Sequence, residues 1–212
     1  FAKERKQGRA TGWPDEGMSP IIEHPDVKRM LMQMKAMTQV SRALCYACAH
    51  AIDMSHKQGP DAAHWADRAS LLTPLAKSFS TDVGMEVASL GVQIHGGMGF
   101  VEETGAARFM RDARIAPIYE GTNGIQAIDL VTRKLNLDDG RCLAEVLRDC
   151  ESSLTHAVGA ETGARYVDTV RSLSEKLASS PNSQQSLAAA TPFARALASL
   201  VAASSLINAS KV

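Results

Sequence analysis

The sequence predicts an all-α protein, an antiparallel helical bundle of the four-helix, up-and-down type that is followed by a C-terminal helical extension. Three observations support this fold class. Apolar residues recur every three or four positions over long stretches, no six-residue segment shows a convincing alternation of polar and apolar side chains, and only 5% of the 212 residues are aromatic. Alanine, leucine and methionine are abundant, which favours helices over strands.

Two long helices are expected to form the first hairpin. Proline fits the first turn of a helix, so the first helix is expected to begin at Pro25 and to end at the turn Gln58-Gly59-Pro60-Asp61. Asp61 can cap the second, antiparallel helix, whose apolar stripe extends to Ile94 and in which Pro74 can cause a kink.

Shorter elements are expected after this hairpin. Glycines at 96, 97 and 99 predict a tight loop, residues 102–114 a short charged helix, and residues 117–124 an irregular stretch. The next helix is expected over residues 125–135, with Asn123 and Gln126 forming a capping box at its start.

The character of the sequence changes after Leu137. Three further apolar stripes, the last two separated by Ser180-Pro181-Asn182, predict three more helices. The sequence therefore divides into a bundle domain of residues 1–136 and a helical extension of residues 137–212.

Charge and composition argue against several classes of protein. Lys and Arg together number 23, as do Asp and Glu, so the formal net charge is zero, and neither a nucleic acid nor an anionic membrane surface is an expected partner. Four cysteines are too few for a disulfide scaffold, and we find no run that resembles a transmembrane segment or a signal peptide. A soluble intracellular protein is expected.

Glu120 is the first candidate for chemistry. It is predicted to lie in a loop just before a helix, beside apolar residues such as Ile118 and Tyr119, and desolvation by such neighbours raises the pKa of a carboxyl group toward the value that a general base needs. Gly121 and Gly124 would let a substrate or cofactor approach the backbone. The alternative is a solvated acid near a helix N-terminus, and local sequence alone favours this alternative.

Two further segments are candidates for cofactor binding. Gln93, His95 and the glycine-rich turn after them would expose backbone amides, although no predicted strand precedes the turn as a dinucleotide fingerprint requires. Arg5 lies in a basic run whose guanidinium groups could bind a diphosphate in a bidentate manner. The alternatives are an ordinary helix-to-helix turn and a solvated basic surface.

No metal site is expected. Cys45 and Cys48 lie on the apolar stripe of the first helix without a second cysteine pair, so we expect two buried small hydrophobic residues. Asp53 and His56 lack the paired Glu-x-x-His pattern of a di-metal site in a bundle.

Three segments, taken jointly, resemble the C-terminal helical domain of the acyl-CoA dehydrogenases. They are Gln93-Ile94-His95-Gly96-Gly97-Met98-Gly99-Phe100, Arg111-Asp112-Ala113 and Ile118-Tyr119-Glu120-Gly121-Thr122-Asn123-Gly124-Ile125-Gln126, in this order. The resemblance covers residues 1–136, in which Arg5 matches the arginine of the family's E-R-x-x-F-G segment. Gly8 stands where that segment usually has an aromatic residue, and the polar loop 11–19 resembles an insertion.

The resemblance implies an enzyme of fatty acid β-oxidation that desaturates fatty acyl-CoA thioesters between the α and β carbons. Glu120 would be the catalytic base, and the substrate would contact Tyr119, Glu120 and Gly121. FAD would be the cofactor, because no amino-acid side chain accepts a hydride reversibly. The implied FAD contacts are Arg5, Gln93 and Gly97 across a dimer interface, and Thr122 and Asn123 within the subunit.

The resemblance also implies partners. These are the acyl-CoA substrate, an electron-transfer flavoprotein, the N-terminal domains of the family, and further copies of the chain in a homodimer or tetramer. Because the sequence starts abruptly at Phe1 and is shorter than family members, we expect a fragment that is inactive or weakly active alone, from a protein of the bacterial cytoplasm or the mitochondrial matrix. The alternative from another class is a non-catalytic helical dimerisation module.

Overall fold

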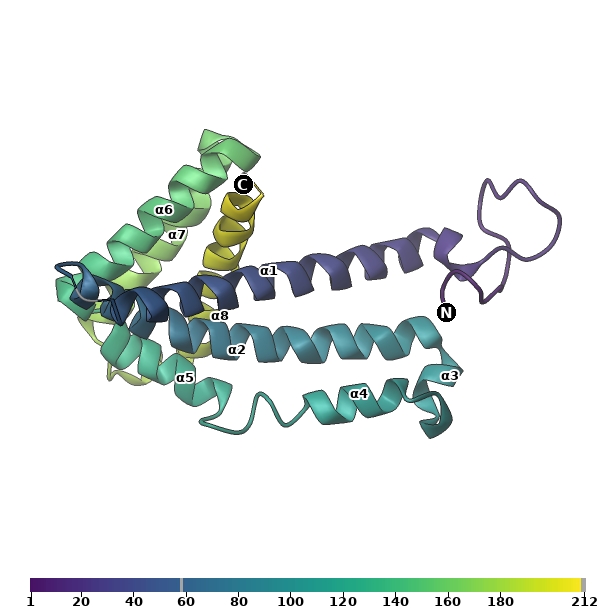
Figure 1. The fold of residues 1–212 in the computed structure, drawn as a ribbon, viewed down its shortest axis with the longest axis horizontal. Coiled ribbons are helices and arrows are strands. Elements are labelled where there is room, and N and C mark those ends of the chain that lie inside the picture. The colour runs from purple at the N-terminus through teal and green to yellow at the C-terminus, as the bar shows by residue number, and fades with distance from the viewer. Residues whose placement is uncertain (58, 211–212) are drawn as a thin grey trace. The chain divides into compact units, whose positions relative to one another are not determined.

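The computed structural model describes residues 1–57 and 59–210, most of which are helical (Figure 1). The long helices are α1 (Pro25–Ser55), α2 (Ala62–His95), α6 (Arg141–Val158), α7 (Ala160–Ser179) and α8 (Gln184–Ala209). The short ones are α3 (Gly97–Phe100), α4 (Ala106–Ala113), α5 (Asn123–Asp129), the π-helical η3 (Leu130–Lys134) and the 3-10 turns η1 (Ile21–Glu23), η2 (Glu102–Thr104) and η4 (Leu137–Gly140). The all-α fold class is confirmed: within the described residues β pairing is limited to one isolated bridge, between Lys6 and Pro20.

The first hairpin follows its prediction closely. α1 begins at Pro25, and Pro74 lies inside an α2 that continues past it. The two helices are antiparallel, since Cys45 Sγ lies 3.3 Å from Ser80 Oγ and Cys48 Sγ, further along α1, lies 3.7 Å from Oγ1 of Thr73, which comes earlier in α2. Gln58, in the turn predicted between them, lies outside the described residues.

Two shorter elements differ from their predictions. The glycine-rich turn expected as a loop continues into the one-turn helix α3. The helix expected over residues 125–135 begins at Asn123 and changes to π-helical hydrogen bonding at Leu130. Apolar spacing places both segments correctly, but it does not resolve the hydrogen-bonding pattern of a single turn.

The chain forms two compact units, each containing one half of α1 and one half of α2. The first unit comprises residues 1–38 and 83–116. Its core consists of the buried side chains of Ile21, Met30 and Ile94, packed against five partly buried apolar residues, which are Ala2, Val27, Leu31, Met34 and Leu90.

The second unit comprises residues 39–82 and 117–212 and holds the largest fully buried side chains. They include Leu44, Leu75, Leu130, Leu147 and Leu197. Helix α8 packs against α5, α6 and α7, so helices of the proposed extension share a core with the end of the proposed bundle domain. The boundary at residue 136 therefore stays a prediction about domain organisation in the sequence.

Among the described residues, α8 is the helix that is long and apolar enough to cross a membrane by length and composition. We find no run in the sequence that resembles a transmembrane segment, so this property of α8 was not expected. Half of its apolar window is buried within the structure, where Leu197, Ala198 and Val201 contribute to the core. The core helix of a soluble protein passes the same test, so the length of α8 is weak evidence for a membrane span.

Candidate functional site

The loop of residues 117–122, directly before α5, has a strained backbone. Glu120 has a φ of 54° and Gly121 a φ of 83°. Positive φ is ordinary for glycine but uncommon for a residue with a side chain, for which it costs about 1–3 kcal/mol. A Cβ atom at position 121 would also lie 3.2 Å from Nε2 of Gln126. Position 121 thus favours glycine, and Glu120 adopts a conformation that neighbouring contacts must maintain.

Three hydrogen bonds hold this loop. Lys77 of α2 donates from Nζ to the backbone oxygen of Gly121 at 2.7 Å, and Gln126 donates from Nε2 to the backbone oxygen of Glu120 at 3.2 Å. The backbone N–H of Asn123 donates to the oxygen of Pro117 at 3.0 Å, which closes the base of the loop. Both residues with positive φ therefore have their carbonyl oxygens bound by side chains.

The side chain of Asn123 is buried and anchors the loop to α2. Its Nδ2 donates to the backbone oxygen of Ser78 at 3.1 Å and to Oδ1 of Asp82 at 2.7 Å. Its Oδ1 accepts from Nζ of Lys77 at 2.9 Å and from the hydroxyl of Thr81 at 3.2 Å. An amide group offers two donors and two acceptor lone pairs, so the hydrogen-bonding capacity of Asn123 is used within the chain.

Thr122 caps α5. Its Oγ1 accepts a hydrogen bond from the backbone N–H of Ile125 at 3.3 Å. The capping box predicted from Asn123 and Gln126 is therefore wrong, because Asn123 is the first helical residue and turns its side chain into the protein. Gln126 instead reaches back to the backbone oxygen of Glu120.

Glu120 itself is exposed, and so are the nearby apolar residues Ile118, Tyr119 and Ile125. The desolvation expected from its sequence neighbours is therefore not provided by this chain alone. Within the described residues neither the Glu120 N–H nor the Gly121 N–H has a hydrogen-bond partner. The loop thus presents a carboxylate, two free amides and an apolar surface, which together can receive a carbonyl group attached to an apolar chain.

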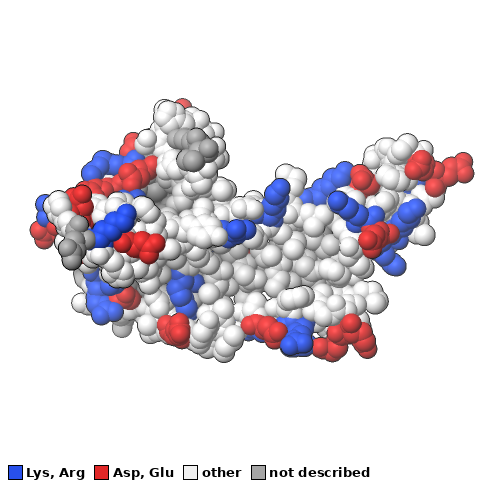
Figure 2. All heavy atoms as spheres, in the orientation of Figure 1, with Lys and Arg blue, Asp and Glu red and all other residues white. Residues whose placement is uncertain are grey.

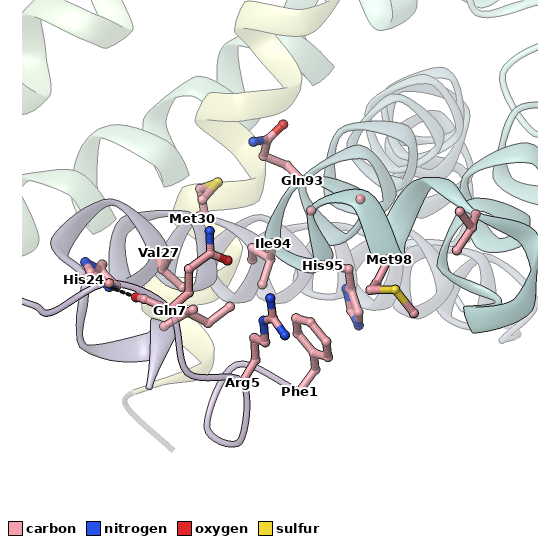
Figure 3. Close-up of a pocket in the computed structure, with 15 residues that line it drawn as sticks. Phe1, Arg5, Gln7, His24, Val27, Met30, Gln93, Ile94, His95 and Met98 are labelled. Carbon is pink, nitrogen blue, oxygen red and sulfur yellow. Dashed lines mark hydrogen bonds between the residues drawn. The ribbon is translucent and has the colours of Figure 1, made fainter. Parts of the chain in front are cut away.

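A second candidate site is a pocket of about 740 Å³ in the first unit (Figure 3). Its lining includes Arg5, Gln93 and Gly97, three residues that the sequence predicts to contact one cofactor. Figure 3 shows the Arg5 guanidinium extending toward Ile94. Across the described chain no carboxylate is paired with this guanidinium. An unpaired guanidinium in a partly apolar pocket suits an anionic group attached to a larger ligand.

Local packing shapes this pocket. The rings of Phe1 and His95 stack with their centroids 4.4 Å apart, and Nε2 of His24 lies 2.8 Å from the backbone oxygen of Gln7. Close approach explains the second glycine of α3, since a Cβ atom at Gly99 would lie 2.3 Å from the backbone oxygen of Val92. The turn sequence therefore sets how tightly α3 folds back on the end of α2.

The loop that resembles an insertion is anchored where it leaves the pocket. The backbone of Ser19 pairs with Gln7 and Gly8 through hydrogen bonds of 3.1 and 2.9 Å. The buried Ser19 hydroxyl accepts a further hydrogen bond, of 2.9 Å, from the N–H of Ala10. These contacts fix the segment that follows Arg5.

Arg111, in the second of the three resembling segments, forms a bidentate ion pair with Glu102, in which Nη2 lies 2.8 Å from Oε2. Hydrogen bonding to this guanidinium lowers the pKa of the Glu102 carboxyl group below its ordinary value. Figure 2 shows acidic and basic side chains interspersed over α4. The pair joins α4 to the turn before it, nine residues away, a contact that helical spacing does not predict.

The described residues contain no group of three or more His, Cys, Asp or Glu side chains that could hold a metal ion. Cys48 is buried, as predicted, and this burial raises the pKa of its thiol. The prediction of burial is wrong for Cys45, which is exposed beside Ser80 because it lies at the edge of the apolar stripe of α1.

The predicted site residues fall into two groups. Arg5, Gln93 and Gly97 line the pocket, whereas residues 119–123 form the loop and the start of α5. Sequence reasoning did not identify Lys77 or Asp82, which bind this loop from α2. The sequence gives only a weak signal for this role, which is that Lys77 and Asp82 are charged residues beside buried positions of a helix.

Comparison with known proteins gives consistent matches. The family described as "Acyl-CoA dehydrogenase, C-terminal domain" matches residues 9–135. The 3-methylmercaptopropionyl-CoA dehydrogenase of Ruegeria pomeroyi is 49% identical over 160 residues, which is 73% of this chain and 27% of that protein. A butyryl-CoA dehydrogenase of Syntrophomonas wolfei is 34% identical over 152 residues, which is 69% of this chain and 25% of that protein.

A solved structure also resembles the chain. Caenorhabditis elegans ACDH-11 in complex with C11-CoA aligns with a TM-score of 0.73 at 22% identity, over 94% of this chain and 35% of that chain. This similarity shows a common fold. The chain spans about a quarter of the length of the two curated relatives named above.

Proposed function

Because the chain belongs to the acyl-CoA dehydrogenase family, we propose that the protein containing it desaturates fatty acyl-CoA thioesters and that this chain supplies the catalytic base, Glu120. The observation that carries the proposal is the loop around Glu120. Its strained backbone is fixed by Lys77 and Gln126, while the carboxylate stays exposed. Because these contacts bind backbone oxygens of the loop and not the carboxylate, the carboxylate remains available for proton transfer.

The substrate would lie against this loop. Glu120 would remove a proton from the α carbon, and the free N–H of Glu120 would donate a hydrogen bond to the thioester carbonyl, where negative charge develops. Tyr119 and Gly121 would contact the substrate beside this group. The exposed apolar surface of Ile118 and Tyr119 suits an acyl chain, whose arrival would supply the desolvation that the chain alone lacks.

FAD is the proposed cofactor, and when bound it supplies the acceptor for the hydride that leaves the β carbon. The pocket fits its diphosphate half, since Arg5 offers an unpaired guanidinium and Gly97 presents no side chain. Gln93 would complete that contact. Thr122 and Asn123 would contact the FAD of their own subunit, and the exposed Thr122 is the more accessible of the two.

The proposed partners follow from the same function. Electrons would pass to an electron-transfer flavoprotein, the N-terminal domains of the family would cover the site, and a homodimer or tetramer would bring two chains to one cofactor. The bacterial cytoplasm or the mitochondrial matrix is the proposed location. The relatives compared by sequence above are bacterial.

The test uses the full-length protein with the substitution Glu120→Gln. The variant should keep its flavin and bind acyl-CoA but lose about two to four orders of magnitude in turnover, the usual contribution of a positioned base. Glu161→Gln, which removes an exposed acid of α7, is the matched control and should turn over normally. Equal turnover in Glu120→Gln and wild type would rule out the catalytic assignment.

The second candidate function is a non-catalytic helical dimerisation module that keeps the same turns for packing. It is favoured only by the exposure of Glu120 in the isolated chain. A full-length protein that purifies without flavin absorbance would support it.

A further inference from the structure

Building on the proposed function, we infer that Lys77 of α2 is a positioning residue for the catalytic base and acts through the backbone of the Glu120 loop. Lys77 lies 44 residues before Gly121 of this loop. Its ammonium group donates to the backbone oxygen of Gly121 at 2.7 Å and to Oδ1 of Asn123 at 2.9 Å. One side chain therefore binds the loop and the first residue of α5.

The two acceptors of Lys77 are not carboxylates, so its contact with the loop is not an ion pair. Both are neutral oxygens, and hydrogen bonds from a charged donor to such oxygens are roughly twice as strong as those between neutral groups. The side chain is only partly exposed, so water competes less for its three donors. The contact thus fixes the direction of the Gly121 carbonyl.

Asn123 links this ammonium group to a balancing charge. Its amide oxygen accepts from Lys77, and its amide nitrogen donates to the carboxylate of Asp82 at 2.7 Å. Positive and negative charges at the two ends of one amide polarise it in the same direction, which strengthens both hydrogen bonds. The arrangement is a continuous path from Asp82 through Asn123 and Lys77 to the backbone of the loop.

The loop needs these contacts because its backbone is strained. Glu120 and Gly121 have consecutive positive φ values, and a residue with a side chain keeps such a conformation only when its surroundings impose it. Without the Lys77 ammonium, the Gly121 carbonyl loses its partner and the two residues can relax. The Glu120 carboxylate then moves, and a displacement of about 1 Å can reduce a rate by about 100-fold.

The experiment uses the full-length, flavin-containing protein with Lys77→Met, which keeps the aliphatic stem and removes the ammonium group. Lys77→Arg is the conservative variant, because it restores charge and donors. Lys134→Met is the matched control, since Lys134 is another largely buried lysine whose Nζ donates to Ser70 at 2.7 Å, outside the loop. The readouts are flavin content, KM, kcat and the kinetic isotope effect with an α-deuterated acyl-CoA.

Lys77→Met should lower kcat by about 10- to 100-fold while flavin content and KM stay close to wild type. The isotope effect should increase, because proton removal becomes rate-limiting, and Lys77→Arg should recover part of kcat. Lys134→Met should leave kcat and the isotope effect unchanged. If Lys77→Met does not fold, Lys77→Gln replaces it with the same expected results.

Two results would overturn the inference. One is a kcat and isotope effect of Lys77→Met equal to wild type. The other is a loss of flavin or of folded protein by both Lys77 variants and by Lys134→Met alike, since that is a general effect on stability. If Glu120→Gln abolishes turnover while Lys77→Met does not, the inference fails and the proposed function stands. If Glu120→Gln turns over normally, the proposed function itself fails.

Discussion

Lys77 donates a hydrogen bond of 2.7 Å to the backbone oxygen of Gly121, although the two residues are 44 positions apart. This bond ties the middle of α2 to the loop that carries Glu120. The loop therefore depends on a helix that bears none of the residues proposed to touch the substrate. Its conformation is set by side chains that bind backbone oxygens, so substitutions of the loop glycine and of α2 should both act on the position of Glu120.

Gly121→Ala should destabilise the protein by about 1–3 kcal/mol. The φ of 83° at this position disfavours any side chain, and the new methyl group would lie 3.2 Å from Gln126. Gly124→Ala is the control, because a Cβ atom there meets only Thr122 Oγ1, at 3.8 Å, and its helical position favours alanine. The free energy of unfolding in denaturant measures both. Equal stability of the two variants would show that the loop tolerates a side chain.

Arg5→Gln should weaken flavin binding by the full-length protein by about 10- to 100-fold, the usual effect of losing charged hydrogen bonds. The comparison variant is Arg9→Gln, whose guanidinium donates instead to the backbone oxygen of Trp13 at 3.3 Å. Flavin titration monitored by fluorescence gives the dissociation constants. A value for Arg5→Gln equal to that of Arg9→Gln would remove Arg5 from the cofactor site.

The thiols of Cys142 and Cys150 should resist alkylation in the native protein. Burial raises the pKa of each from 9.0 to about 11, which lowers its reactive thiolate fraction about 100-fold at pH 8. The exposed Cys45 should react first with iodoacetamide, and all three should react in denaturant, as read by mass spectrometry. Native labelling of Cys150 as fast as that of Cys45 would contradict the burial.

The same pKa shifts predict how stability depends on pH. Because the folded-state pKa lies above the unfolded value, these thiols contribute stability that is fully present below pH 9 and is lost as the pH rises from 9 toward 11. Replacing Cys150 by Ser should reduce this dependence, as measured by denaturant unfolding at several pH values. An unchanged slope between pH 9 and 11 would argue against the shift.

Much of the fold was predictable, because the spacing of apolar residues determines which face of a helix is buried. This periodicity predicts α1, α2 and the three helices after Leu137, which are α6, α7 and α8. The spacing of apolar residues does not predict the contacts of Lys77, since a charged residue beside the apolar stripe of a helix is usually solvated. Only the packing of residues 117–123 against α2 shows that its ammonium group has two acceptors.

The sequence predicts which segments form the candidate site, but it does not predict which way their side chains point or which partners they bind. Asn123 is a residue type that often caps a helix, but Ser78 and Asp82 of α2 accept hydrogen bonds from its amide nitrogen, and Thr122 takes the capping position. Glu120 was expected among apolar neighbours, yet adjacent residues in a loop can all face outward. Local sequence does not determine which groups of a loop face the protein.

The most direct test of the central claim follows flavin absorbance after anaerobic mixing of full-length protein with an acyl-CoA, since one turnover isolates the chemical step. The wild type and Glu161→Gln should bleach rapidly, and Glu120→Gln should bleach at least about 100-fold more slowly with flavin content unchanged. Bleaching of Glu120→Gln at the wild-type rate would contradict the assignment of Glu120 as the base.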